Sequence, residues 1–313
     1  MRISCSANKK NNSGLSKFFK ELLTYWENNN LGIKLVDSSQ KSDINLLFAF
    51  GSLKKDAKNV IRIDGVYYDK SRISLNDSIK KNIKLANGVI YQSNWSKVFA
   101  ENMLSVSNKN NTIIYNGVNQ KKYTNNRIKN IWNFEKTFVS CANWRMNKRP
   151  DAIANAFILL QKELDKNIGL VFIGDGEIKQ IKHNNIIYLG NLNYKELINT
   201  YQMCDYMCHI CHLDACPNSV IEGLSCGLPV ICNNIGGTPE IVQSNGVVVK
   251  IDKKFNFTPI NRMEEVDSSS IDILLLKEGM KKCIETQWNF QRPDLDISVS
   301  ALKYYKFFKD LLK

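Results

Sequence analysis

The chain has 313 residues, of which 43% are hydrophobic and 23% are charged, close to the averages of globular proteins. No apolar run approaches the roughly 20 residues that cross a bilayer, which excludes a chain built from membrane-spanning helices. The formal net charge of +13 indicates an anionic partner, such as nucleic acid, a membrane surface or a phosphorylated small molecule.

The length predicts two domains, because a single core usually stops growing below this size. The first residues, MRISCSANKKNN, contain no apolar stretch long enough for a secretory signal. The nine cysteines are odd in number and irregularly spaced, unlike a disulfide framework. We therefore expect a cytoplasmic protein with reduced thiols.

Residues 1–120 show strand and helix patterns in alternation. We expect strands at 2–6, 32–36, 44–50, 59–63, 88–93 and 112–115. We expect helices at 13–29, at 75–86 and from Trp95 onward. The first of these helices has an apolar face, formed by Leu15, Phe18, Phe19, Leu22, Leu23 and Trp26.

Residues 121–135 are polar and lack either period, so they are the expected linker. A second set of strands follows at 137–142, 169–174, 186–190, 205–210, 228–232 and 246–249, with helices at 151–164, 194–203 and 218–226. Such alternation predicts parallel sheets covered on both faces. The expected fold class is α/β, with doubly wound domains at 1–120 and 136–295 and a ligand site at the carboxyl ends of their strands.

Residues 296–313 form an expected C-terminal helix. Its apolar stripe consists of Leu302, Tyr305, Phe308, Leu311 and Leu312, and lysines occupy other positions. We expect this helix to pack back toward the N-terminal domain. The alternative is that it lies on an anionic membrane as a basic amphipathic helix.

The stretch DACPNSVIEGLSCG contains a proline turn followed by an expected helix. Asn218 or Ser219 is a suitable N-cap, and the first-turn amides of such a helix attract a phosphate. Ser219 and Glu222 also have the spacing of a capping box, which would explain Glu222 without a ligand. Both interpretations of Glu222 remain open at this point.

Asp214 precedes this turn, and Gly236 and Gly237 follow the next expected strand. All of them should line the same crevice at the strand ends. Asp214 and Glu222 could accept hydrogen bonds from sugar hydroxyls, with Glu222 nearer a ribose and Asp214 nearer a second sugar. This pattern indicates a nucleotide-sugar site.

The segment PNSVIEGLSCGLPVICNNIGGTPEIV resembles the signature of the family-four retaining glycosyltransferases, of the glycosyl transferases group 1 type. VSCANWRMNKRPDAIANAFILL, LVFIGDGE and IIYNGVNQKKY resemble other segments of that family in the right order. The resemblance implies a GT-B fold, with two Rossmann-like domains facing each other across a cleft. It also implies transfer of a sugar from a nucleotide diphosphate sugar to an acceptor.

Four residues take catalytic roles from this resemblance. Lys148 and Arg145 would contact the donor diphosphate, although strict alignment places Asn143 at the arginine position. Asp214 stands where the family normally has glutamate in its acid, seven residues, acid motif, and Glu222 matches the second acid. The shorter side chain of Asp214 could alter sugar preference.

Further donor-binding residues are expected in the glycine loop, the basic loop, the second strand and the helix start; they are Ser13, Gly14, Arg149, Gly174, His209, Pro217, Asn218, Ser219 and Val220. Asp64 falls, with Arg62, where many relatives carry a histidine near the reacting carbon. Asp64 would orient the donor sugar or the acceptor hydroxyl. The alternative is a turn-forming Asp-Gly without a catalytic role.

Retention, as the resemblance implies, suggests front-face attack in which the departing phosphate oxygen helps deprotonate the acceptor hydroxyl. No dedicated general base is then required. Lys148, an arginine and the helix start could neutralise the leaving group without a metal. No pair of aspartates suited to a divalent ion is evident in the sequence, so neither a metal nor a cofactor is expected.

Cysteine and histidine gather in one stretch, at Cys204, Cys208, His209, Cys211, His212 and Cys216. Soft ligands at short spacing can indicate zinc. Alternate residues of a strand face opposite sides, however, and no second ligand pair follows. We therefore expect no metal, although a nucleic-acid-binding protein with a metal knuckle remains an alternative function.

A dinucleotide-dependent oxidoreductase is a further alternative, which the lack of a convincing G-x-G-x-x-G after any strand disfavours. For the transferase, the expected acceptor is a glycan or a lipid-linked glycan. Peripheral association with an anionic membrane would suit the positive charge. Nucleic acid is not expected as a partner of this transferase, and its acceptor domain is short for the family.

Overall fold

The structure is a computed structural model that describes residues 1–6, 14–123, 126–164, 166–251, 255–261, 271–290 and 292–313. The chain divides into two compact units, each of which is described by itself. Unit 1 comprises Met1–Asn119, Asn256–Asn261 and Pro293–Lys313, and unit 2 comprises Gln120–Phe255 and Arg262–Arg292.

Unit 1 is built on a parallel six-stranded sheet in the order β2-β1-β3-β4-β5-β6. Its strands are β1 (Arg2–Cys5), β2 (Lys34–Val36), β3 (Ile44–Phe48), β4 (Lys58–Ile63), β5 (Gly88–Tyr91) and β6 (Asn111–Ile113). Its helices are α1 (Gly14–Asn28), α2 (Asn76–Leu85), α3 (Asn94–Leu104) and α9 (Ile297–Leu312), with short 3-10 turns at Ile73–Leu75 and Pro293–Leu295. The parallel pairing confirms the expected α/β class for this half.

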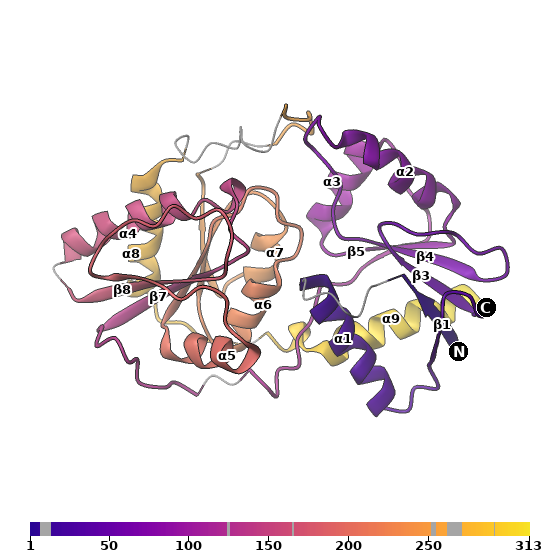
Figure 1. Cartoon of the computed structure of the whole chain (residues 1–313), viewed down its shortest axis with the longest axis horizontal. Coiled ribbons are helices and arrows are strands. Elements are labelled where there is room, and N and C mark those ends of the chain that lie inside the picture. The colour runs from indigo at the N-terminus through magenta and orange to yellow at the C-terminus, as the bar shows by residue number, and fades with distance from the viewer. Residues whose placement is uncertain (7–13, 124–125, 165, 252–254, 262–270, 291) are drawn as a thin grey trace. The chain divides into compact units, whose positions relative to one another are not determined.

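Helix α1 carries the predicted apolar face. Its described members, Phe18, Phe19, Leu22, Leu23 and Trp26, are all buried in the core of unit 1. Helix α9, yellow in Figure 1, packs against α1. The indole N–H of Trp26 donates to the carbonyl oxygen of Ala301 at 3.1 Å, which links the two helices directly.

The predicted stripe on the C-terminal helix is only partly right, because Phe308 and Leu311 pack in or against the core of unit 1, whereas Leu302 and Leu312 are exposed. The buried face of α9 is formed by Ile297, Ser300, Ala301, Tyr304 and Phe308. Leu302, expected in the stripe, is 47% exposed. The two faces share Phe308, with Leu311 packed beside them, and the ring of Tyr304 lies 6.2 Å from that of Trp26 between centroids. Helical periodicity alone could not choose between them, because apolar residues lie on both.

A short segment from the second half of the chain returns to unit 1, which the sequence did not indicate. Ile260 pairs with the chain next to Asp69: its amide donates to the carbonyl of Tyr68 at 2.9 Å, and its carbonyl accepts from the amide of Lys70 at 2.8 Å. Phe257 lies against Phe99, with ring centroids 6.4 Å apart. Unit 1 is therefore assembled from three stretches of the sequence.

Unit 2 contains a second parallel six-stranded sheet, in the order β12-β11-β10-β7-β8-β9. Its strands are β7 (Lys136–Cys141), β8 (Ile168–Ile173), β9 (Ile186–Tyr188), β10 (Tyr206–His209), β11 (Val230–Asn233) and β12 (Gly246–Val249). Its helices are α4 (Pro150–Leu164), α5 (Tyr194–Met203), α6 (Asn218–Ser225), α7 (Thr238–Val242) and α8 (Ile273–Glu285), with a 3-10 turn at Met146–Lys148. Helices α7 and α8 were not predicted from the sequence.

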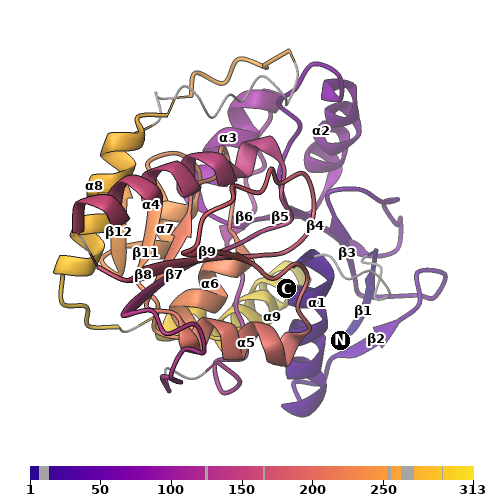
Figure 2. The ribbon, with the colours of Figure 1, turned by 60° about the vertical axis from the view of Figure 1, so that its left-hand side comes forward.

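Helices α4 and α8 pack together beside this sheet (Figure 2). They bury apolar side chains such as Phe157, Leu276 and Met280 in one cluster with residues of β7, β8 and β10. This cluster is the core that holds the central strands, and with them the loops at their carboxyl ends.

The segment expected to link the domains runs along unit 2. The guanidinium of Arg127 donates to the carbonyl oxygens of Cys204 and Gly227, the second at 3.0 Å. The amide of Ile128 donates to the carbonyl of Gln202 at 3.1 Å. These contacts give part of the polar segment a defined position on its own unit.

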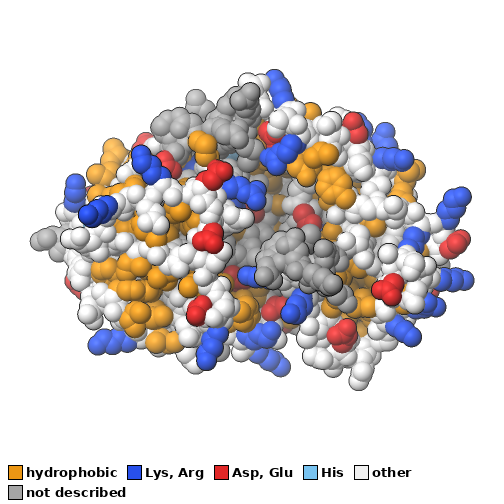
Figure 3. All heavy atoms as spheres, viewed as in Figure 1, with side chains coloured by type: hydrophobic (Ala, Val, Ile, Leu, Met, Phe, Trp, Pro, Cys, Tyr) orange, Lys and Arg blue, Asp and Glu red, His pale blue; other side chains and the backbone are white. Residues whose placement is uncertain are grey.

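Among the described residues, no helix is long and apolar enough to cross a membrane. Lys and Arg side chains are spread across the face seen in Figure 3 and form no single dense patch there.

Candidate active site

Three loops meet at the carboxyl edge of the sheet in unit 2, after β7, β10 and β11. The amide of His212 donates to the carbonyl of Asn147 at 2.8 Å, which joins the first loop to the second. The amide of Gly237 donates to the carbonyl of Asp214 at 2.7 Å, which joins the second loop to the third. Asp214 and the two glycines therefore lie together, where ligands of such sheets bind.

Gly236 is required at this junction. Its φ is +95°, and a Cβ atom on it would lie 2.7 Å from the carbonyl oxygen of Asp214. Any other residue would push the loop after β11 away from Asp214. The glycine pair is thus explained by close backbone approach.

Lys148 and Asp214 form an ion pair at the centre of these loops. Lys148 Nζ lies 2.6 Å from Asp214 Oδ2, and about a fifth of each side chain is exposed (21% and 19%). Burial acts to raise the pKa of Asp214, but the charge of Lys148 and the nearby His209 outweigh it, so that the pKa lies well below its ordinary value. Burial acts to lower the pKa of Lys148, and the charge of Asp214 reverses this and raises it. Both groups are therefore charged at neutral pH.

His209 ends β10 beside this pair. Its Nε2 lies 3.5 Å from Asp214 Oδ2 and has no hydrogen-bond partner among the described residues. Burial is the main cause that lowers the pKa of this imidazole, which is therefore neutral near pH 7. A buried nitrogen without a partner is costly in a folded protein. Such an atom is suited to a hydrogen bond with a ligand.

His209, Cys211 and Asp214 place three possible metal-ligand atoms within 4.8 Å of one another. The ammonium group of Lys148 already contacts Oδ2, one of the two carboxylate oxygens of Asp214. Burial raises the pKa of the Cys211 thiol to about 12.

Helix α6 starts close to this pair in the sequence, at Asn218, four residues after Asp214. The expected cap is wrong: the N-cap is Pro217, and no side chain caps the helix. The capping box predicted from Ser219 and Glu222 is therefore absent. Asn218 and Ser219 are only partly buried and Val220 is buried, so the helix start is not packed away inside its unit.

Glu222 lies one turn further along α6 and is buried, with 7% of its surface exposed. The hydroxyl of Tyr201 on α5 donates to its Oε2 at 3.5 Å. The described contacts thus bring Lys148, Asp214 and His209 together, and they place Glu222 beside α5.

The two arginines of the basic loop differ in environment. Arg145 is exposed, just before the 3-10 turn at Met146–Lys148, whereas Arg149 ends that turn and is 97% buried (3% exposed). The charge of Arg149 acts to lower the pKa of the Cys211 thiol, although burial dominates. Exposure leaves Arg145 available to an incoming ligand.

Gly174 follows β8 and is explained by local packing. Its φ is +106°, and a Cβ there would lie 1.9 Å from the carbonyl oxygen of Ala142. Its amide donates to the carbonyl of Gly190 at 2.7 Å. The residue lets the loop after β8 approach the loop after β7.

In unit 1, Asp64 follows β4 and makes an ion pair with the buried Arg62. Ser13 lies outside the described residues, and Gly14 is the first residue of α1. Gln92 and Asn116, which the sequence analysis missed, contact this ion pair. Their signal in the sequence was weak: each is a polar residue at the end of an apolar strand segment.

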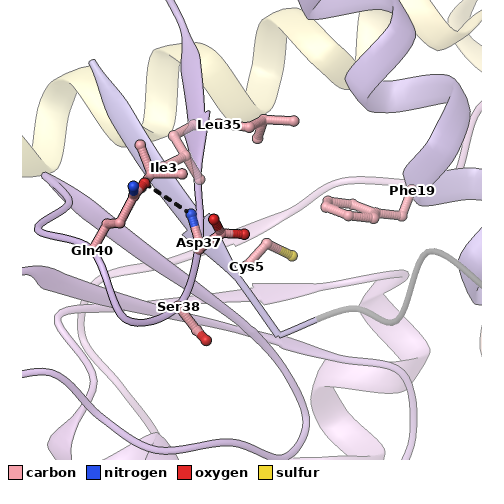
Figure 4. Close-up of a pocket in the computed structure, with 8 residues that line it drawn as sticks. Ile3, Cys5, Phe19, Leu35, Asp37, Ser38 and Gln40 are labelled. Atoms are coloured by element: carbon pink, nitrogen blue, oxygen red, sulfur yellow. Dashed lines mark hydrogen bonds between the residues drawn. The ribbon is translucent and has the colours of Figure 1, made fainter.

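A cavity of about 360 Å³ opens near the ends of β1 and β2 (Figure 4). Its polar residues are Asp37, Ser38 and Gln40, and the amide of Asp37 donates to Gln40 Oε1 at 3.2 Å. None of the residues predicted for the donor site lines this cavity, which belongs to unit 1.

The family model of the glycosyl transferases group 1 matches residues 122–285, slightly more than half of the chain. The chain belongs to this family. The glycosyl transferases group 1 match runs from before β7 to the end of α8 and contains Lys148, Asp214 and Glu222. The ion pair beside α6 is therefore part of the segment that defines the family.

Two curated relatives match part of the chain. N-acetyl-alpha-D-glucosaminyl L-malate synthase of Bacillus anthracis is 27% identical over 186 residues, covering 54% of this chain and 47% of the relative. An uncharacterised glycosyltransferase of Methanocaldococcus jannaschii is 30% identical over 153 residues, covering 46% and 40%. The matches thus span less than half the length of these two members of the wider glycosyltransferase group.

Solved structures resemble the whole chain. A glycosyltransferase from Rickettsia africae has a TM-score of 0.65 at 15% identity, covering 100% of this chain and 98% of the other. HepE of Anabaena, solved with UDP and glucose, has a TM-score of 0.62 at 10% identity, covering 98% and 99%. These likenesses show the fold. This member of the glycosyl transferases group 1 has the GT-B fold, with two Rossmann-like α/β domains.

Proposed function

We propose that this protein transfers a sugar from a nucleotide diphosphate sugar to an acceptor hydroxyl. The observation that carries the proposal is the Lys148–Asp214 pair, with its 2.6 Å contact, in the loops before α6 within the family-matching segment. The HepE complexes with UDP and with UDP-glucose support a nucleoside diphosphate as the carrier. Belonging to this family favours sugar transfer over the nucleic-acid-binding and oxidoreductase alternatives.

The site has groups for both parts of such a donor. A departing diphosphate gains negative charge, which the ammonium of Lys148 and the first turn of α6 are suited to stabilise. The ammonium has three N–H donors, so its contact with Asp214 leaves others for phosphate oxygens. Asp214 and Glu222 would accept hydrogen bonds from sugar hydroxyls, and the exposed Arg145 would add a second cation.

We further propose that transfer retains the anomeric configuration and needs no metal. The acceptor oxygen would attack from the face that the diphosphate leaves, and its proton would pass to the departing phosphate oxygen. Lys148 supports this proposal, because its ammonium group already neutralises the carboxylate that a divalent ion would need. The proposed acceptor is a glycan or a lipid-linked glycan, reached from the cytoplasmic side of an anionic membrane.

The test is a thermal-shift screen of UDP-, GDP- and ADP-sugars in the presence of EDTA, followed by slow donor hydrolysis with the best binder. A ligand at about 100 times its dissociation constant should stabilise the protein by about 2.7 kcal/mol. Lys148→Ala and Glu222→Ala should each abolish this shift and lower the unliganded melting temperature only modestly.

The matched control is Lys136→Ala, since Lys136 also pairs with an aspartate of unit 2, Asp205, at 3.3 Å, but at the opposite end of β7. This variant should keep the full ligand-induced shift. If no nucleotide sugar stabilises the wild-type protein, or if Lys148→Ala binds as the wild type does, the proposed function is wrong.

A further inference from the structure

Glu222 is a buried carboxylate that meets a phenol from another helix of unit 2. It lies one turn into α6, and 7% of its surface is exposed. The hydroxyl of Tyr201 on α5 donates to its Oε2 at 3.5 Å, and the ring of Tyr201 is wholly buried. A charged group away from water needs such donors, because an unsatisfied carboxylate in a protein interior is costly.

Helix α5, which carries this phenol, is held at both of its ends. At the carboxyl end, the guanidinium of Arg127 donates to the carbonyl oxygen of Cys204, just past α5, and to that of Gly227, just past α6. A cation is favourable there, because the carboxyl ends of helices carry partial negative charge. At the amino end, the ring of Tyr194 meets that of Tyr123 at a centroid distance of 5.6 Å. The contacts of Arg127 also tie α5 to α6.

The hydroxyl of Tyr201 is a neutral donor. Burial is the main cause that raises its pKa well above the ordinary value, and the thiol of Cys141 and the carboxylate of Glu222 add to this effect. Cys141, which hydrogen-bonds the hydroxyl, is the last residue of β7, the strand that precedes the loop of Lys148. A ring packed on all sides moves little, so this hydroxyl gives Glu222 Oε2 a fixed partner between β7 and α6.

The pairing of a buried tyrosine with a buried glutamate is not explained by stability alone. Two apolar side chains of the same shape would fill this part of the core about as well. An ionised carboxylate has about four acceptor sites on its two oxygens, and Tyr201 fills one of them. The pairing therefore orients a carboxylate that can accept further hydrogen bonds, in the segment that matches the family.

We infer that Tyr201 is a positioning residue, which holds Glu222 Oε2 so that the carboxylate accepts hydrogen bonds from the ribose hydroxyls of the nucleotide donor. The inference rests on the proposed sugar transfer and names a residue outside the acid motif that serves the donor site through Glu222. Tyr201 itself touches no substrate and takes part in no bond change. Its hydroxyl sets the rotation of the carboxylate, and this rotation decides how well the ribose hydroxyls are bound.

The experiment compares UDP with 2′,3′-dideoxy-UDP, which lacks both ribose hydroxyls, by titration calorimetry on the full chain. If the thermal-shift screen favours guanine or adenine, the corresponding pair with that base takes their place. The wild type should bind the ribonucleotide about tenfold to a hundredfold more tightly, as expected for hydrogen bonds to a charged group. Tyr201→Phe keeps the ring and removes the hydroxyl. It should weaken UDP about threefold to tenfold and leave the affinity for dideoxy-UDP within about twofold.

Tyr206→Phe is the matched control. Tyr206 is another buried tyrosine of unit 2, at the amino end of β10, whereas His209 marks the carboxyl end of that strand. Its variant loses the same hydroxyl and should keep the ratio of the two dissociation constants within about twofold of the wild-type ratio. Melting temperatures without ligand establish that both variants are folded.

Glu222→Gln tests whether the effect of Tyr201 passes through the carboxylate. It should lower the ratio at least as far as Tyr201→Phe does, and combining the two substitutions should lower it no further. A further fall in the double variant would overturn the inference, because the hydroxyl would then act elsewhere.

Two other results would also overturn it. One is a ratio that Tyr201→Phe leaves unchanged, whether both ligands bind more weakly or neither does, since the hydroxyl then serves the fold alone. The other is a wild type that binds UDP and dideoxy-UDP equally, since Glu222 then does not bind the ribose. Both results leave nucleotide binding intact, whereas a protein that binds no nucleotide at all would refute the proposed function itself.

Discussion

At the scale of single residues, the ion pair of Lys148 and Asp214 places an ammonium group and a carboxylate side by side in the candidate site. The resemblance implies that this carboxylate stands where the family normally has a glutamate, and the ammonium group lies 2.6 Å from it. Because aspartate is one methylene shorter than glutamate, the contact with Lys148 keeps the carboxylate of Asp214 close to the loop after β7. We expect this to restrict which sugar the site accepts.

The pair predicts a characteristic pH dependence of stability. The pKa of Asp214 is lowered from 3.8, so its contribution is present above that value and is lost as pH falls through the folded pKa. The pKa of Lys148 is raised from 10.5, so its contribution is present below that value and is lost as pH rises through the folded pKa. The pair should therefore stabilise the protein equally across the range between the two ordinary values.

We predict that Asp214→Asn lowers the free energy of unfolding by about 2 kcal/mol, because Lys148 loses a charged hydrogen-bond partner. Denaturant melts at about pH 7, pH 8 and pH 9, above the range in which the neighbouring His209 takes up a proton, should give the same difference from the wild type. Asp310→Asn is the control, since Asp310 forms an exposed pair with Lys313 and its loss should leave the free energy of unfolding almost unchanged. A difference that changes strongly over this range would contradict the assignment of charges.

The residues of this pair could be singled out because the acid motif and the basic loop are each a short continuous stretch of the sequence. The capping box of Ser219 and Glu222 could not be judged in that way. Its spacing was correct, but the helix starts at Asn218 with Pro217 as its cap. Whether a side chain turns back to its own helix depends on its neighbours in space, such as Tyr201 for Glu222.

At the scale of elements, α9 shows how periodicity can mislead. Apolar residues lie all around this helix, and its neighbour α1 decides which side is buried. Trp26 of α1 contacts Ala301, Tyr304 and Phe308, and these residues form the buried face. The expected stripe through Leu302 and Tyr305 instead lies toward solvent in part.

Two adjacent tyrosines provide the test of this correction. Tyr304→Ala should lower the free energy of unfolding by about 3 to 5 kcal/mol, as for other buried aromatic residues, because it leaves a cavity beside Trp26. Tyr305→Ala removes the same side chain from a half-buried position and should cost about 1 kcal/mol or less. Urea melts followed by tryptophan fluorescence would measure both, and equal losses would contradict the observed face.

The strands were easier to predict than the helices. Buried parallel strands such as INLLF and IGLVFI are continuous apolar runs, and the structure confirms strands at Ile44–Phe48 and Ile168–Ile173. Helix α7 has five residues, too few for a clear period. Residues Asn256–Asn261 belong to unit 1 through backbone hydrogen bonds to Tyr68 and Lys70. No local sequence pattern predicts that this segment pairs with unit 1.

At the scale of the whole molecule, the net charge of +13 is the dominant property. The exposed lysines of α9, including Lys303, Lys306 and Lys309, contribute to it. On the face shown in Figure 3 the charges are spread, so attraction to a surface should come from the sum of many weak contacts. Screening by salt should then weaken such binding strongly.

We predict binding to vesicles that contain phosphatidylserine and none to vesicles of phosphatidylcholine alone, because each lysine or arginine near an anionic surface contributes about 1 kcal/mol. Co-sedimentation at low salt should find the protein with the anionic vesicles, and raising the salt toward physiological strength should release much of it. Equal binding to both kinds of vesicle, or no binding to either, would contradict the proposal that the protein associates with anionic membranes.

The sequence alone determined the alternation of strands and helices, the family and the residues of the acid motif, because these are local patterns along the chain. Tertiary structure decided which face of α9 is buried, how α6 begins, and that Lys148 rests on Asp214. It also brought together Arg62, Asp64, Gln92 and Asn116, which are up to 54 positions apart. Parallel strands bring distant residues to one edge of a sheet, and only the order of the strands determines which residues meet there.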